Sequence, residues 1–537
     1  MIIRGKPDSE SLYKEEDLIL QNNLKLYLPN GYDEKQLIDE LANHYSIQKE
    51  QPVTKKLTFY DTFDWRLFNQ SLVLYESENE LLLKQLLSNG DVAQPVKITK
   101  PPVFIKDLPE SALKQTLASI IEMRVLLKLV EARLQSTPYR ILNQEEKTVV
   151  LLINEEISPS SEAEPALAAY LWVKPVRGYP KYVHELTNRL QEMGCTPVEK
   201  DVYFLALDSV GKKPGDYSAK LNVQLNPEMR SDEATKILLH FLLNVMKSNE
   251  AYIKKDLDTE FLHDFRVAIR RTRSALSQIK YVFSEEITHR FKEDFAYIGK
   301  LSNELRDLDV YLLAEESYRA MLPDVLRDDI GPLFDYLRQK RVKALEKSIN
   351  GLNSKKYTQI LQDWETFLNE PPADSSIAHN ADRPIIELAQ RRIYKRYRWI
   401  VKSGKLILEN TEDEKLHRLR IGCKKLRYLM EFFSSLFPEE KIATLIKQLK
   451  KLQDNLGAFN DLCVQEEYLL KIAKELPLTD QQASKTLLAI GSLVNTLNQE
   501  RQMVKASFAE IFTNFASPKN KALFQELFAS KKKAGAL

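Results

Sequence analysis

Two stretches in the C-terminal half decide how this sequence folds: HDFRVAIRRTRSAL at residues 263–276 and HRLRIGCKKLRYLM at residues 417–430. At an offset of 154 residues the two stretches align five basic positions: His263 with His417, Arg266 with Arg420, Arg270 with Lys424, Arg271 with Lys425, and Arg273 with Arg427. The same offset places RDLDV at 306–310 over NDLCV at 460–464 and so aligns Asp307 with Asp461. Chance explains this agreement poorly, and the pattern predicts an internal duplication.

Helical spacing places most of the aligned basic residues on one face. At 100° per residue, offsets of 0, 3, 7 and 10 fall within an arc of roughly 80° and extend along about 15 Å of helix. The residues predicted to bind an anion on these two rows are His263, Arg266, Arg270, Arg273, His417, Arg420, Lys424 and Arg427. Arg271 and Lys425 fall on the other side and are interpreted as flanking or solvated residues. Like charges on one face repel one another, and a bound polyanion relieves that repulsion.

Each of these features also has a less specific explanation. A single basic helix face is usually only a solvated face, and it is the second, matching row that favours a binding site. The two histidines could equally orient neighbouring side chains. Asp307 and Asp461 are predicted to pair with the arginines and position them, or to cap helices, and not to act as catalysts. Gly422, in the middle of the second row, predicts close packing against another helix.

Charge and composition limit the class of protein. The chain has 537 residues, of which 43% are hydrophobic and 29% charged, and its net charge is +2. Residues 1–213 hold 26 Lys/Arg and 31 Asp/Glu, so the basic surplus lies in the C-terminal part. The longest apolar run is far too short to span a bilayer. Three widely spaced cysteines and a start without an apolar signal core favour a reducing cytoplasm.

Periodicity divides the chain into two kinds of structure. The first two hundred residues alternate between strand-like and helical segments, which predicts a mixed α and β domain over residues 1–210. Beyond the segment SVGKKPGDY at 209–217 the apolar spacing is helical throughout. The interruption at 371–384 separates a first helical repeat, 218–370, from a second, 384–520. The predicted fold class is α+β with two domains: an antiparallel sheet or barrel with helices, then an all-α bundle with a pseudo-two-fold repeat.

A third basic stretch, AQRRIYKRYRWIVK at 389–402, carries six positive charges and no acid. The aromatic residues interleaved in it, with Trp399, would also suit a nucleic-acid contact. The i, i+4 spacing of Arg392 and Arg396 fits an anion-lined bundle at least as well. Both arginines are therefore predicted to extend the same groove.

Residues of about 220–515 closely resemble the CHAD family, the conserved-histidine α-helical domain. The resemblance rests on the two stretches quoted first and on LRDLDV, RRIYKRYRWIVKSGKLI and LKKLQDNLGAFNDL. It implies a helical bundle with internal two-fold pseudosymmetry that binds inorganic polyphosphate in a basic central groove. The ligand comes from the resemblance; the spacing itself shows only a doubled anion-binding face.

The first domain resembles a CYTH, or triphosphate tunnel, domain through LTFYDTFDWRLFNQSLVLYE, Lys84, LWVKPVRGYPKYVHEL and TPVEKDVY with Lys200. Active members carry E-x-E-x-K on a strand, whose carboxylates hold a divalent metal over a triphosphate. Here the matching strand reads QNNLK: Gln21 and Asn23 replace the glutamates, and Lys25 is kept. Trp172 and Lys174 stand where the family has a later pair of strand acids, and Tyr75 and Ser77 stand where it has R-x-R after the second strand. Neutral amides replace hard anionic oxygens poorly, so the tunnel is expected to be inert.

The sequence therefore predicts a non-enzymatic polyphosphate-binding protein with no catalytic residues, metal site or cofactor. One alternative is a metal-dependent triphosphatase. In that case the metal ion would be bound by acids outside the E-x-E-x-K position, such as Glu76, Glu78, Glu155 and Glu156. The second is an RNA- or DNA-binding protein, which is expected less strongly. No membrane partner is expected. The predicted location is the cytoplasm, with association to polyphosphate granules only if polyphosphate is the ligand.

Overall fold

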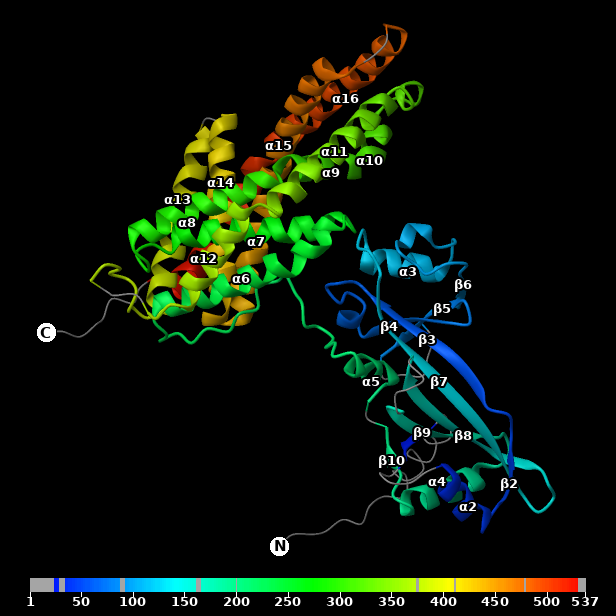
Figure 1. Cartoon of the computed structure of the whole chain (residues 1–537). Coiled ribbons are helices and arrows are strands. Elements are labelled where there is room, and N and C mark those ends of the chain that lie inside the picture. Colours follow the sequence, from blue (N-terminus) through cyan, green and yellow to red (C-terminus); the bar gives the residue numbers. More distant parts are fainter. Residues whose placement is uncertain are drawn as a thin grey trace, which may run out of the picture. The chain divides into compact units, whose positions relative to one another are not determined.

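The chain divides between Ser218 and Ala219 into two units, and this division directly follows the Gly- and Pro-containing segment 209–217. The structure is a computed structural model, drawn in Figure 1. It describes residues 24–28, 34–86, 92–160, 166–198, 200–372, 376–409, 412–477 and 480–529. Gln21 and Asn23, predicted to replace metal-binding glutamates, lie outside the described residues.

One antiparallel sheet organises the first unit. Its strands are β1 (Leu24–Tyr27), β2 (Ser46–Lys49), β3 (Val53–Asp61), β4 (Leu72–Ser77), β5 (Glu80–Gln85), β6 (Val96–Lys97), β7 (Leu127–Leu142), β8 (Thr148–Pro159), β9 (Ala168–Pro175) and β10 (Thr196–Pro197). They pair in the order β10-β1-β9-β8-β7-β3-β4-β5-β6, and β2 pairs with β7. The predicted antiparallel sheet with helices is confirmed.

Helices lie against the sheet because its strands bury side chains on alternate sides. The helices are α2 (Glu34–Ala42), α3 (Ala112–Ile121), α4 (Pro180–Glu192) and α5 (Val202–Ser209). Leu26 and Val173 pack with α2 and α4 in one apolar cluster. Phe59 of β3 and Tyr170, which lies on the opposite face of β9 from Val173, pack with Tyr203 of α5 in a second cluster. The alternation thus gives separate apolar layers to different helices.

The second unit is helical throughout its described part. Its helices are α6 (Ser231–Lys254), α7 (Thr259–Gln278), α8 (Glu285–Leu301), α9 (Asn303–Leu313), α10 (Glu315–Met321), α11 (Gly331–Leu352), α12 (Lys355–Asn369), α13 (Ile385–Glu409), α14 (Asp413–Phe432), α15 (Glu439–Glu475), α16 (Asp480–Ala506), α17 (Phe508–Phe515) and α18 (Pro518–Phe528). The predicted helical region is confirmed. No helix in the described ranges is long and apolar enough to cross a membrane.

Helix positions follow the offset of 154 residues that aligns the two basic stretches. Three pairs of helices, α6 with α13, α7 with α14, and α8 with α15, begin 154 residues apart. The helices that carry the basic rows, α7 and α14, both have 20 residues. Asp258 caps the start of α7 by accepting hydrogen bonds from the backbone N–H groups of Glu260 and Phe261.

Each basic helix buries its opposite face. On α7 the buried residues include Phe261, Phe265 and Ile269, which recur every four positions. On α14 the buried residues include Leu419, Cys423, Leu426 and Met430. This spacing fixes the rotation of each helix, because turning the basic row inward would expose the apolar stripe.

Gly422 confirms the predicted close packing. A Cβ atom on Gly422 would overlap the ring of Trp399, which belongs to α13. The same happens at Gly404 of α13, where a Cβ atom would overlap the ring of Phe512. Both glycines therefore let a large aromatic ring lie directly on a helix backbone.

Candidate anion-binding site

The helices α7 and α14 pack against each other in opposite directions. Arg271 of α7 pairs with Glu431, near the end of α14, at 3.0 Å. Seven residues further along α7, the side-chain amide of Gln278 donates to the carbonyl oxygen of Lys425 at 3.2 Å, earlier in α14. This antiparallel crossing brings the C-terminal halves of the two helices together.

Lys424 lies at this crossing. Among the described residues its ammonium group makes no hydrogen bond or ion pair. Burial, together with the positive charges of Arg420 and Arg270, lowers the pKa of Lys424 to about 8, and Arg427 acts in the same direction. The carboxylate of Asp461 opposes this shift. Lys424 is therefore a cation held among cations from two helices.

Arg270 acts electrostatically on basic residues of both rows. This exposed arginine lowers the pKa of Arg266 on its own helix and that of Lys424 on the other. Arg266 is less accessible, and burial, the larger cause, helps lower its pKa to about 10. The Arg266 guanidinium donates hydrogen bonds from Nη1 to the Gly299 carbonyl, Ser302 Oγ and Asn303 Oδ1, at 2.8–3.2 Å. These bonds fix Arg266 in place, whereas Arg270 makes no polar side-chain contact with the described residues.

The two histidines contact equivalent positions. His263 Nδ1 lies 2.9 Å from Nη2 of Arg306, and His417 Nδ1 lies 2.6 Å from Oδ1 of Asn460. Arginine cannot accept a hydrogen bond, so the Arg306 guanidinium is the donor in this contact and His263 Nδ1 is the acceptor. Positions 306 and 460 are again 154 residues apart. The contacts favour the alternative in which the histidines orient neighbouring side chains.

Carboxylates neutralise part of the predicted rows. Arg420 pairs with Asp461 at 3.1 Å, and Arg427 pairs with Glu431 at 2.6 Å. Asp307 lies close enough to Arg266 to raise its pKa against the effect of burial. Both predicted aspartates therefore lie beside arginines of the rows. Arg273, like Arg270, is exposed and has no ion pair with the described residues.

Arg392 and Arg396 lie in different surroundings from those predicted. Arg392 donates to the carbonyl oxygen of Lys280 at 3.4 Å, and the guanidinium of Arg396 lies over the ring of Trp399 at 5.6 Å. Arg396 and Lys292 of α8 both lower the pKa of Lys425, after burial as the first cause. The described contacts group Arg396 with Lys425, on the flanking side of α14, and not with the Arg270–Lys424 crossing.

The sequence comparison missed Arg306. This arginine of α9 donates to His263 and lowers the pKa of Arg266. Its aligned partner is the neutral Asn460, so a search for matched basic positions passes over it. The sequence feature that could have identified Arg306 is its position in RDLDV, directly before Asp307.

In the sheet unit, the three lysines Lys25, Lys84 and Lys200, named for the CYTH resemblance, are each paired with a carboxylate. Lys84 of β5 lies 2.9 Å from Asp201, the residue that caps α5, and Lys25 of β1 lies 3.4 Å from Glu155 of β8. The Lys25 ammonium also lies over the ring of Trp172, 4.1 Å from its centre. Burial lowers the pKa of Lys25 against the effect of Glu155.

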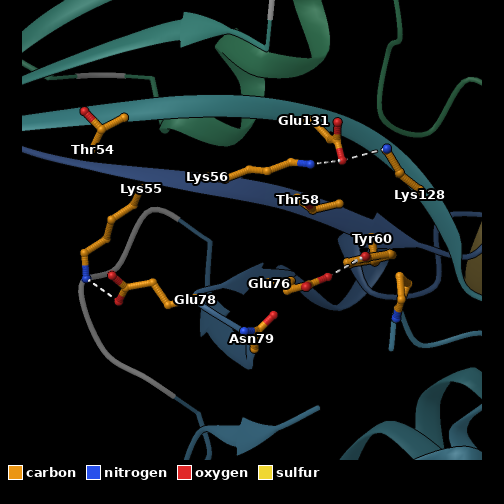
Figure 2. A pocket seen from close by; sticks show the side chains of 11 residues that line it. Thr54, Lys55, Lys56, Thr58, Tyr60, Glu76, Glu78, Asn79, Lys128 and Glu131 are labelled. Carbon is orange, nitrogen blue, oxygen red and sulfur yellow. Dashed lines mark hydrogen bonds and ion pairs between the residues drawn. The ribbon is translucent and has the colours of Figure 1, made fainter. Parts of the chain in front are cut away.

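The alternative metal-binding acids are engaged separately. Glu78 pairs with Lys55 at 2.8 Å, and Glu76 accepts a hydrogen bond from the Tyr60 hydroxyl at 2.7 Å. Both line a cavity of about 340 Å³, shown in Figure 2. Glu155 and its neighbour Glu156 project to opposite faces of β8. Within the described ranges, no three His, Cys, Asp or Glu side chains are grouped so that they could hold a metal ion.

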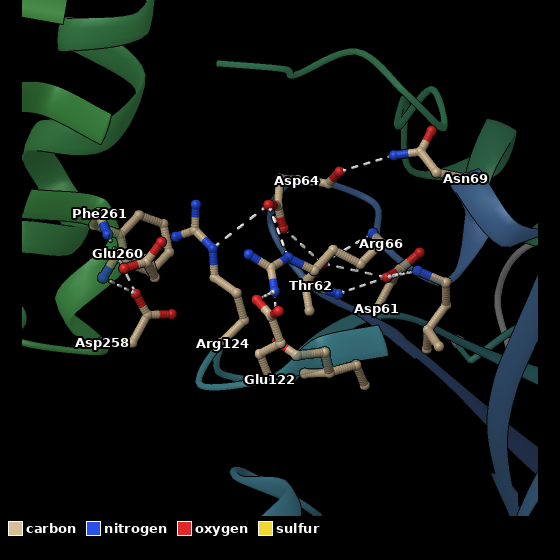
Figure 3. Close-up of polar contacts among 12 residues, drawn as sticks. Asp61, Thr62, Asp64, Arg66, Asn69, Glu122, Arg124, Asp258, Glu260 and Phe261 are labelled. Carbon is tan, nitrogen blue, oxygen red and sulfur yellow. Dashed lines mark hydrogen bonds and ion pairs between the residues drawn. The ribbon is translucent and has the colours of Figure 1, made fainter. Parts of the chain in front are cut away.

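The segment DTFDWRLFNQS, quoted for the CYTH resemblance, makes a turn stabilised by Asp61 (Figure 3). Its carboxylate accepts hydrogen bonds from the backbone N–H groups of Thr62, Leu67 and Phe68 at 2.7–3.0 Å. Burial raises the pKa of Asp61 to about 6, although these bonds oppose the rise. Asp64 pairs with Arg66 in the same turn. These polar residues shape the turn between β3 and β4.

Comparison with known proteins shows what these helices are similar to. The family model of the CHAD domain matches residues 237–470. The uncharacterised proteins MT2285 and Rv2226, from two strains of Mycobacterium tuberculosis, are each 23% identical over 301 residues, or 55% of this chain. The match spans about half (54%) of the length of these relatives.

Two solved structures are also similar. The CHAD domain from the plant Ricinus communis is 22% identical, with a TM-score of 0.47, over 56% of this chain and 96% of that one. HpAC1 from Hippeastrum, described as having a dominant triphosphatase activity, is 16% identical, with a TM-score of 0.26, over 36% of this chain and 99% of that one. The residues that match the CHAD family model all lie in the helical unit, where the motifs predicted the resemblance.

Proposed function

We propose that this protein binds inorganic polyphosphate, without catalysis, across the crossing of α7 and α14. The observation that carries the proposal is the pair Arg270 and Lys424. These two cations lie within electrostatic reach of each other, on different helices, and neither has an ion pair among the described residues. A protein gains nothing in stability from such repulsion, and a bound anion removes it.

The rows suit a chain of phosphates better than one phosphate. Each row extends along about 15 Å of helix, enough to contact several consecutive phosphates. Guanidinium and ammonium groups donate charge-assisted hydrogen bonds to phosphate oxygens. In the proposed complex Arg270, Arg273 and Lys424 make the first contacts, while Arg266, Arg420 and Arg427 add to the field from positions already fixed by partners. The resemblance to CHAD proteins supports inorganic polyphosphate as the ligand.

The non-catalytic part of the proposal rests on the sheet unit. Lys25 and Lys84, the lysines expected to grip a triphosphate, are each neutralised by a carboxylate. Three of the four acids considered for a metal site, Glu155, Glu78 and Glu76, are bonded to Lys25, Lys55 and Tyr60 respectively. A phosphate-release assay with Mg²⁺ or Mn²⁺ and inorganic triphosphate is expected to show no turnover. Metal-dependent turnover would instead support the triphosphatase alternative.

Isothermal titration with polyphosphates of graded length tests the binding. Affinity should rise with chain length and fall steeply with salt, because more contacts release more counterions. Equal affinity for triphosphate and for long chains would contradict the proposal. Competition with single-stranded RNA separates the nucleic-acid alternative: RNA should displace polyphosphate poorly at physiological salt, since base binding requires stacking surfaces as well as charge.

A further inference from the structure

We propose that the cavity of the sheet unit drawn in Figure 2 binds a short peptide of dipeptide size through the charges at the two ends of that peptide. The cavity has a volume of about 340 Å³, and its lining comes from β3, from β7, from β4 and the turn that follows β4, and from Pro101. One end of the cavity carries an excess of positive charge and the other end carries a carboxylate without a cation.

This cavity lies on the face of the sheet opposite the lysines of the CYTH resemblance. The Lys84 ammonium lies over the ring of Tyr75, 5.9 Å from its centre, and Tyr75 packs against Phe59. Glu76 and Tyr60 are the next residues on the same two strands, so they project to the other face. The cavity is therefore a separate site, which the motifs of the sheet unit do not explain.

A β-bulge builds the positive end of the cavity. The pairing of β3 with β7 skips Leu129, which is an extra residue in β7. Regular alternation would place Lys128 and Glu131 on opposite faces, whereas the extra residue brings both to the same face. The Lys128 ammonium lies 2.7 Å from Glu131 Oε1, and the Lys56 ammonium lies 2.7 Å from the same oxygen (Figure 2). Two ammonium groups thus share one carboxylate, which leaves an excess positive charge.

Glu76 forms the negative end of the cavity. Its carboxylate accepts a hydrogen bond from the Tyr60 hydroxyl at 2.7 Å and has no ion pair with any residue that the structure describes. Burial, followed by the bond to Glu76, raises the pKa of Tyr60 above its ordinary value, so the hydroxyl keeps its proton and continues to donate. A neutral donor does not cancel the charge of Glu76, and the carboxylate retains acceptor capacity for an ammonium group.

The spacing of the two ends indicates the length of the ligand. Thr58 of β3 pairs with Glu76 on one side and with Glu131 on the other. Neighbouring strands lie about 4.8 Å apart, so the backbones of the two acids are about 10 Å apart. A hydrogen bond of about 3 Å at each end leaves roughly 4–7 Å between the charged groups of the ligand. Two linked residues span at most about 7 Å, whereas the nitrogen and carboxyl carbon of one α-amino acid are only about 2.5 Å apart.

The remaining lining favours a zwitterion over a polyanion or a polycation. Lys55 and Glu78 neutralise each other at 2.8 Å, so the lining as a whole holds equal numbers of lysines and glutamates. A polyanion or a polycation would meet charges of its own sign in such a cavity, whereas a zwitterion matches both ends. Thr54, Thr58 and Asn79 also line the cavity and supply polar side chains for the peptide group between the charges.

Ligand-observed NMR titration of the full chain with L-alanyl-L-alanine tests the site. Acetylation of the amino terminus of this peptide removes the ammonium, and amidation of its other terminus removes the carboxylate. Each change should weaken binding about tenfold, because each removes one charge-assisted contact. Absence of binding by the free dipeptide, or equal binding by all three peptides, would overturn the proposal. Binding of L-alanine as tight as that of the dipeptide would overturn the assigned length.

Variants of the two ends show which residues recognise which charge. Glu76→Gln keeps the acceptor for Tyr60, and should abolish the difference between the free and the acetylated dipeptide while the amidated one still binds more weakly. The double variant Lys56→Gln/Lys128→Gln should show the reverse. The control is Glu145→Gln, which removes an acid paired with Lys147 at 2.8 Å outside the cavity lining and should change neither difference. Loss of both differences in Glu76→Gln, with an unchanged circular dichroism spectrum, would contradict recognition of the ammonium by Glu76.

Discussion

Two lysines of the sheet unit and two cations of the helical unit have opposite kinds of neighbours. In the sheet unit Lys25 and Lys84 lie beside Glu155 and Asp201, with aromatic rings around Lys25. At the crossing of α7 and α14, Arg270 and Lys424 lie beside other cations. A paired lysine is already satisfied and has little to gain from a phosphate, because the ligand must first displace its carboxylate. An unpaired one gains a partner on binding. The difference teaches that pairing, more than the number of cations, separates a structural site from a binding site.

The largest expected effect comes from removing the unpaired cations. The double variant Arg270→Ala/Lys424→Ala should lose about 3 kcal/mol of binding free energy, roughly a hundredfold in affinity for long polyphosphate, since each charge-assisted hydrogen bond contributes about 1.5–3 kcal/mol. Titration calorimetry measures this. The matched control is Lys415→Ala/Arg418→Ala, which removes two charges from α14 that are paired with Glu412 and Glu414. Equal losses in both variants would mean that only total charge matters.

The second prediction concerns pH. The free protein holds the pKa of Lys424 at about 8, and bound phosphates raise it because they favour the protonated ammonium. Binding therefore takes up a proton above pH 8, and affinity falls as pH rises. Polyphosphate should bind about tenfold more weakly at pH 9 than at pH 7. Lys424→Arg should bind with nearly the same affinity at both values. A pH dependence unchanged in Lys424→Arg would assign the titration to another group.

A smaller effect, of opposite sign, is expected at Glu431. This carboxylate pairs with both Arg271 and Arg427. Glu431→Gln keeps the shape of the side chain and frees both arginines, so affinity should rise several-fold, mainly through Arg427 on the row. Competition titration resolves such a gain. Weaker binding, with an unchanged circular dichroism spectrum, would show that Glu431 orients Arg427 and does not compete with the ligand.

The smallest effect on binding is expected from the paired lysines of the sheet unit. Lys25→Ala/Lys84→Ala should leave polyphosphate affinity within twofold of the unchanged protein. The same change should destabilise the sheet unit by about 1–3 kcal/mol, because Glu155 and Asp201 lose their partners in partly buried positions. Chemical denaturation measures the stability and titration the affinity. A large loss of affinity without unfolding would remove the distinction between the two units.

Local spacing was enough to predict much of the helical unit. The offset of 154 residues matched the starts of three helix pairs, and Gly422 correctly predicted a close approach, which the ring of Trp399 fills. These features depend on periodicity within one helix, which a sequence displays directly. The histidine contacts were predicted only as one of two alternatives, because spacing does not show what lies opposite a helix face.

Features that depend on distant residues were not predicted. Lys84 and Asp201 are separated by more than a hundred positions, and nothing in their local sequence joins them. The grouping of Arg396 with Lys425 depends on how α13 lies against α14. Arg306 was passed over because its aligned residue is neutral. In each case the partner of a charged group is set by tertiary packing.

A crystal of the full chain soaked with a short polyphosphate gives the most direct test of a phosphate site at the helix crossing. The account predicts ordered phosphates within hydrogen-bond distance of both Arg270 and Lys424, continuing along the row toward Arg273. Phosphates bound at Lys25 and Lys84, or on the Arg396 and Lys425 side of α14 alone, would contradict it.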